Sequence, residues 1–178
     1  MEYIVCCKGM TDKIMIILGL DPGLASLGFG IISYDNVNAQ MIDYGVLHTK
    51  AGVPLPRRLA SLFEGVSDLL ERYQPDDIAI EELFFNTNVT TAITVGEARG
   101  AAIVACSTRT ENIFEYTPLQ IKQAVTGYGR ADKLQIQSMV KMLLNLRETP
   151  KPDDAADALA VAICHAHSLK MRESYRMK

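Results

Sequence analysis

An unbroken apolar run that ends in a turn does most to limit the folds open to this 178-residue chain. Residues Met15–Leu20 read MIILGL, and Asp21-Pro22-Gly23 follows directly. A continuous aliphatic run bounded by a strong turn signal is typical of a strand that is buried on both faces. Such a strand lies inside a sheet with helices on both sides, so the run favours an α/β fold.

The remaining patterns predict the order of the elements. Two further strands, joined by a hairpin loop, make three antiparallel strands at the start, and helices then alternate with short strands. The predicted strands are Met15–Leu20, Gly28–Tyr34, Gln40–Leu47, Asp77–Glu81 and Asn112–Tyr116. The predicted helices follow Pro54, span about Thr90–Thr108, begin at Thr117-Pro118 and after Asp132, and span about Asp153–Leu169. This order predicts an α/β fold with a five-stranded mixed sheet flanked by helices.

Length and composition indicate one globular domain. Hydrophobic residues make up 48% of the chain and charged residues 22%, which excludes a disordered or collagen-like chain. We expect residues 14–170 to form the domain, residues 1–13 to be a flexible extension and residues 171–178 to be a basic C-terminal tail.

The cysteines and the apolar runs indicate where in the cell the protein is located. The four cysteines form no C-x-x-C pair, so they indicate reduced thiols rather than a disulfide framework or a zinc site. No apolar run approaches the ~18–20 residues that cross a bilayer. We therefore expect a cytoplasmic protein with no membrane partner.

Four acidic residues stand at positions that suit a metal site. Asp21 follows the first strand and Glu81 ends the fourth, while Asp154 and Asp157 share one face of the last helix. If the first and fourth strands are neighbours, all four carboxylates meet at one sheet edge and repel unless cations lie between them. Carboxylate oxygens are ligands for Mg²⁺ or Mn²⁺, and two such ions could clamp a phosphodiester.

Each acid also has a simpler interpretation. Asp21 fits an ordinary Asp-Pro-Gly turn, and Asp153 and Asp154 fit acids that favour a helix N-terminus. Asp157 and Glu81 are harder to explain in this way, because both interrupt or end an apolar element where an unpaired charge is costly.

Other residues also leave alternatives open. Phe84 follows the Glu81 strand and is either core or a stacking surface for a base. Lys122, Arg130 and Lys133 belong to a basic stretch that is either a solvated helix face or a phosphate contact. His165 and His167 point to different helix faces, which argues against a joint metal site. The glycines after Asp21 match no phosphate-loop pattern.

The net charge of -3 alone argues against a nucleic-acid partner. The value averages separate features, however. Setting the four candidate acids aside changes the sum from -3 to +1, and residues 122–147 hold five basic residues against one acid. Residues 170–178 hold four basic residues against one acid. A modestly basic surface around an acidic site is compatible with DNA.

Five segments together resemble the RuvC family of Holliday-junction resolvases, within the ribonuclease H-like superfamily. The resemblance covers nearly all of residues 15–169. The motifs are LGLDPGLASLGFGI at 18–31, IAIEELFF at 78–85, VGEARGAAIVA at 95–105, QIKQAVTGYGRADK at 120–133 and DDAADALAVAICHAH at 153–167. Each is weak alone, but five in the family's order are specific.

The resemblance implies a metal-dependent endonuclease that cuts four-way DNA junctions in recombination and repair, leaving 5′-phosphate and 3′-hydroxyl ends. It implies that the four acids are catalytic and bind two Mg²⁺ ions, with Mn²⁺ as a substitute. Phe84 would handle bases, and Lys122 and Lys133 would contact the DNA backbone. It also implies a homodimer, for which the helix with Gly96 and Gly100 is a candidate surface, and a RuvA–RuvB branch-migration complex as partner.

Other functions remain open at this point, among them a phage-encoded or RNA-directed nuclease. A non-catalytic junction-binding scaffold would share the fold, although the complete acid set argues against it. An actin-like ATPase would share the Asp21 turn, but such proteins need two domains around a nucleotide. The resemblance leaves Asp153 without a role.

Overall fold

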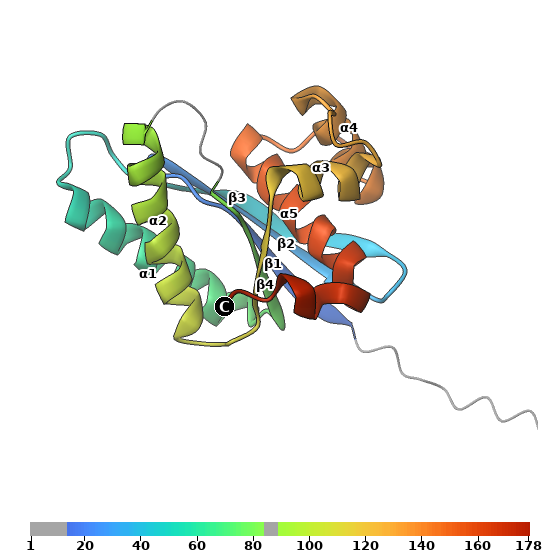
Figure 1. Cartoon of the computed structure of the whole chain (residues 1–178), viewed down its shortest axis with the longest axis horizontal. Coiled ribbons are helices and arrows are strands. Elements are labelled where there is room, and N and C mark those ends of the chain that lie inside the picture. Colours follow the sequence, from blue (N-terminus) through green and yellow to red (C-terminus); the bar gives the residue numbers. More distant parts are fainter. Residues whose placement is uncertain (1–13, 84–88) are drawn as a thin grey trace, which may run out of the picture.

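The computed structural model describes residues 14–83 and 89–178, and within them a five-stranded sheet separates two layers of helices (Figure 1). The predicted extension, residues 1–13, and Phe84 lie outside the described residues. The strands are β1 (Met15–Asp21), β2 (Ser26–Tyr34), β3 (Ala39–His48), β4 (Asp77–Glu81) and β5 (Ile113–Tyr116). Their order across the sheet is β3-β2-β1-β4-β5, which confirms the predicted mixed sheet.

The apolar run forms the central strand, as its composition predicts. Ile17, Leu18 and Leu20 of β1 are buried, with side chains on alternate faces of the sheet. β1 pairs antiparallel with β2 and parallel with β4. β2 begins two residues before the predicted start because its pairing with β3 continues to Ser26 opposite His48.

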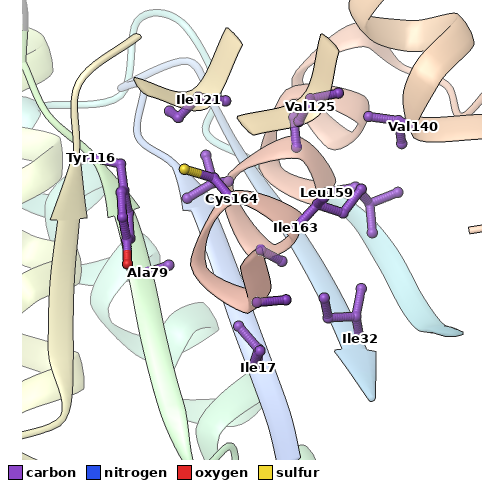
Figure 2. Packing of buried hydrophobic residues seen from close by; sticks show 14 of the residues in the cluster. Ile17, Ile32, Ala79, Tyr116, Ile121, Val125, Val140, Leu159, Ile163 and Cys164 are labelled. Atoms are coloured by element: carbon purple, nitrogen blue, oxygen red, sulfur yellow. The ribbon is translucent and has the colours of Figure 1, made fainter. Parts of the chain in front are cut away.

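Helices cover the sheet on both faces (Figure 1). They are α1 (Leu55–Tyr73), α2 (Val89–Ser107), α3 (Pro118–Thr126), α4 (Lys133–Leu143) and α5 (Asp153–Ser168). α1 and α2 pack on the face that carries Leu18 and Leu20, whereas α3, α4 and α5 pack on the face that carries Ile17. Figure 2 shows Leu159 and Ile163 of α5 in this second core. None of the described helices is long and apolar enough to cross a membrane.

α5 lies unusually close to the sheet because two strands carry glycine beneath it. A Cβ atom added to Gly19 of β1 would lie 2.2 Å from the carbonyl oxygen of Ala158, and one added to Gly28 of β2 would lie 2.0 Å from that of Asp154. Real Cβ atoms do not approach a backbone so closely. Gly19 and Gly28 therefore allow close helix packing. They place the first turns of α5 against the end of β1 and the start of β2.

The C-terminal residues pack against the sheet. A 3₁₀ helix (Leu169–Tyr175) brings the Arg172 guanidinium to 2.6 Å from Asp77, a carboxylate that is only 1% exposed. The buried His165 bridges the same carboxylate and the Tyr116 hydroxyl, at 2.9 Å each. His165 is thus a hydrogen-bonded core residue.

Candidate active site

The ends of β1 and β4 bring two of the predicted acids together. The strands are parallel neighbours with Leu20 opposite Ile80, so their last residues, Asp21 and Glu81, lie next to each other at the same end of the sheet. The two carboxyl groups lie close enough for Glu81 to raise the pKa of Asp21.

The first turns of α5 add the other two acids. One oxygen each of Asp21, Asp154 and Asp157 lies within 4.8 Å of the others. The Ser26 hydroxyl donates a hydrogen bond to Asp154 and fixes its carboxylate at the start of β2. We call Asp21, Glu81, Asp154 and Asp157 the acid group.

The acid group carries more negative charge than its surroundings balance. Burial raises the pKa of Asp21 to about 8, with further contributions from Glu81, Asp157 and Asp154. Burial also raises the pKa of Glu81, although its interaction with Asp21 opposes the change. The pKa of Asp157 is raised by burial despite the nearby Lys133. Buried oxygens with excess negative charge are the donor set that a hard divalent cation prefers, so these residues fit such an ion.

Lys133 contacts the acid group through Asp157. It also contacts Asp153, which lies outside the group. Lys133 Nζ lies 3.3 Å from Asp157 Oδ2 and 3.2 Å from Asp153 Oδ2. Gln137 donates a hydrogen bond of 2.9 Å to the second oxygen of Asp153. Sequence patterns could not place these contacts, since they depend on how α4 packs against α5.

Two cavities flank Glu81. The first, of about 310 Å³, is lined by Glu81, Pro118, Ile121, Lys122, Lys133, Ile136, Asp157 and Ala160. The second, of about 340 Å³, is lined by Asp21, Pro22, Glu81, Glu82, Leu83, Val95, Arg99 and Pro118. The predicted Lys122 and Lys133 thus border the acid group, whereas the predicted Arg130 is exposed in the turn between α3 and α4 and lines neither cavity.

Arg99 is a site residue that the sequence patterns missed. Its Nε donates to the backbone oxygen of Glu81 at 3.2 Å, and its Nη2 lies 2.7 Å from Glu115 on β5. Arg99 therefore ties α2 to the strand end that carries Glu81. The sequence signal that could have revealed Arg99 is a single arginine in a helix of small residues. No neighbouring residue in the sequence explains an arginine at that position.

Asp21 makes the stability of the metal-free protein depend on pH. The unfolded chain releases the Asp21 proton near 3.8, whereas the folded chain keeps it up to about 8. The folded state binds more protons in this window, so the free energy of unfolding falls as the pH rises. We expect Asp21→Asn to remove this slope and to be more stable than wild type at about pH 8 in EDTA.

Urea unfolding of both proteins at about pH 6 and about pH 8 measures the effect. Mg²⁺ should restore the wild type selectively, because a cation stabilises the state that binds it. Equal pH slopes for wild type and Asp21→Asn in EDTA would contradict the assigned burial of this charge.

Comparison with known proteins places the chain in a family. A profile of the crossover junction endodeoxyribonuclease RuvC matches residues 17–165. The chain belongs to the RuvC family. A RuvC from Alkaliphilus metalliredigens is 54% identical over 164 residues, which cover 92% of this chain and all of that protein.

Solved structures agree with this assignment. A Thermus thermophilus RuvC in complex with a Holliday junction substrate superposes with a TM-score of 0.84 at 35% identity, over 88% of this chain and 96% of that one. A yeast mitochondrial Holliday junction resolvase superposes with a TM-score of 0.64 at 15% identity, over 90% of this chain and 81% of that one, and shares the fold. The predicted RuvC resemblance and ribonuclease H-like fold are confirmed.

Proposed function

We propose that this protein resolves four-way DNA junctions by metal-dependent hydrolysis of two phosphodiesters, leaving 5′-phosphate and 3′-hydroxyl ends that ligase can seal. The acid group at the sheet edge, in a chain of the RuvC family, is the observation that carries the proposal. The junction substrate in the Thermus thermophilus complex supports the same substrate here.

Asp21, Glu81, Asp154 and Asp157 would hold two Mg²⁺ ions, with Mn²⁺ as a substitute. Bound there, the ions would supply activation of the attacking water and charge stabilisation for the leaving oxygen. Ser26 holds Asp154 in place through its hydroxyl. The cavity beside Glu81 and Asp157 offers room for a phosphate group next to Lys122 and Lys133.

The DNA contacts would extend from this cavity. Lys122 and Lys133 border it, and Arg130 lies exposed on the following turn, where a phosphate can reach it. Phe84 remains a predicted base contact. Since Arg172 and Arg176 pair with acids of this chain, the C-terminal residues add less to the DNA surface than their charge suggests.

A homodimer would place two active sites on opposing strands of a junction. The outer face of α2 supports such an interface, because Ile93 and Val104 are 57% and 56% exposed and lie on one side of the helix. Gly100 lies between them, and an added Cβ atom there would meet nothing within 4 Å. Small residues on this face would let a second helix approach closely.

We expect Val104→Arg to convert the dimer into a monomer, because a charge on this face would lose its water on association. Sedimentation measures the mass, and the monomer should nick junctions without pairing the two cuts. The control is Val37→Arg, in the β2–β3 turn, where Val37 is 79% exposed. A fully dimeric Val104→Arg protein would exclude this α2 surface.

Family membership also supports a RuvA–RuvB branch-migration complex as partner. The proposed DNA substrate would place the activity in the cytoplasm. Both statements depend on junction cleavage, and its absence would refute them.

Incubation with labelled junction, duplex and single-stranded DNA tests the proposed activity. We expect cleavage of the junction alone, and only with Mg²⁺ or Mn²⁺. Tight junction binding without cleavage under any divalent cation would instead identify a binding scaffold. Binding should weaken steeply with salt, because lysine and arginine contacts to phosphates release counterions.

A further inference from the structure

Asp153 stands beside the acid group without belonging to it. Its carboxylate is exposed, with a side-chain exposure of 58%, and its oxygens are outside the set that Asp21, Asp154 and Asp157 form. Both of its oxygens nevertheless have specific partners. One accepts a hydrogen bond from Gln137, and the other lies 3.2 Å from Lys133 Nζ.

The two partners come from one face of α4. Lys133 and Gln137 are four residues apart on this helix, and Asp153 and Asp157 are four residues apart on α5, so the two pairs face each other. Gln137 is only 8% exposed, which holds its amide in place within the core. Asp153 is therefore fixed from one side and offers its free oxygen to the lysine.

Lys133 has a second partner, Asp157, which belongs to the acid group. Its ammonium lies 3.3 Å from Asp157 Oδ2, an oxygen of the acid group. An ammonium and a divalent cation compete for one carboxylate oxygen. When Asp157 binds a cation, Asp153 is the partner that keeps Lys133 in place. Lys133 then stays at the cavity that both Lys133 and Glu81 line.

We propose that Asp153, fixed by Gln137, is a positioning residue for Lys133. It holds the ammonium at the edge of the acid group and lowers its competition with the divalent cation for Asp157. The inference rests on the proposed function for its catalytic consequence, but its effect on cation binding is independent of DNA.

Titration calorimetry of the DNA-free protein with Mg²⁺ measures that effect directly. We expect Asp153→Asn to weaken Mg²⁺ binding about 3–10-fold, the size of coupling that contacting residues show. In a Lys133→Met background the same substitution should change Mg²⁺ binding far less. A loss of equal size in both backgrounds would show that Asp153 acts through its charge alone and would overturn the proposal.

A second variant separates positioning from charge. Gln137→Met keeps the volume of the side chain and the negative charge of Asp153, but it removes the hydrogen bond that fixes the carboxylate. We expect weaker Mg²⁺ binding in this variant also, whereas unchanged binding would overturn the role of Gln137. Glu148→Gln removes an exposed acid outside the site and serves as the matched charge control.

Junction cleavage then reports the catalytic consequence. Asp153→Asn should lower the single-turnover rate at saturating Mg²⁺ with unchanged junction affinity, and Asp153→Glu, which keeps a carboxylate for Lys133, should recover most of the rate. A wild type that binds Mg²⁺ but does not cut junctions would refute the proposed function, not the pairing. Cutting that is unaffected by Asp153→Asn would refute the positioning role alone.

Discussion

Asp21→Asn is expected to lower the rate of junction cleavage by at least ~10³-fold, while junction binding stays at the wild-type level or becomes tighter. Asp21 is the acid that the others surround. Glu81 helps to raise its pKa, and one of its oxygens lies within 4.8 Å of oxygens of Asp154 and Asp157. An asparagine keeps the size of the side chain but removes the charge that a divalent cation needs.

The reason for unchanged binding is that Asp21 would hold a cation and not a phosphate. Single-turnover cleavage of a labelled junction in Mg²⁺ gives the rate, and mobility shift in EDTA gives the affinity. Asp68→Asn, which removes an exposed acid on α1, is the matched control and should cut at the wild-type rate. Mg²⁺-dependent cutting by Asp21→Asn at a rate close to wild type would remove this residue from the site.

Gly28→Ala is expected to disable the site from a position that bears no functional group. The added Cβ atom would lie 2.0 Å from the carbonyl oxygen of Asp154, and that backbone atom cannot move unless α5 moves. We expect a loss of about 3 kcal/mol in the free energy of unfolding, the upper end of the usual cost of overpacking. The shift carries Asp154 and Asp157 away from Asp21, so cleavage should fall more than stability explains.

Gly65→Ala is the control for this variant. Its added Cβ atom meets the flexible end of the Leu47 side chain at 2.9 Å, and alanine favours the α1 helix. We therefore expect a change in stability of less than about 1 kcal/mol and normal cleavage. Urea unfolding and single-turnover rates on both variants give the comparison. Wild-type stability of Gly28→Ala would show that α5 is free to move off the sheet.

Much of the fold follows from local patterns in the sequence. The apolar run of β1 predicts its central place in the sheet, because only a strand covered on both faces can lack polar positions. Thr117 and Asp132 predict the starts of α3 and α4, and both form capping boxes with the residue three positions on. These features depend on residues near one another in the chain.

The parts that sequence patterns missed depend on packing between distant segments. Lys133 reaches Asp153 and Asp157 because α4 lies against α5, and no local pattern encodes that approach. The reason for a glycine at position 28 becomes visible only when α5 lies on β2. Arg99 likewise needs the position of Glu81 and Glu115 to be understood.

Mapping of both cuts on a single labelled four-way junction tests the central claim most directly. With Mg²⁺, the protein should introduce two nicks at symmetric positions in opposing strands, each with a 5′-phosphate that ligase seals without further treatment. Without the cation the junction should remain bound and intact. Cuts that persist in EDTA, or nicks that ligase cannot seal, would contradict the account of a metal-dependent hydrolysis carried by the acid group.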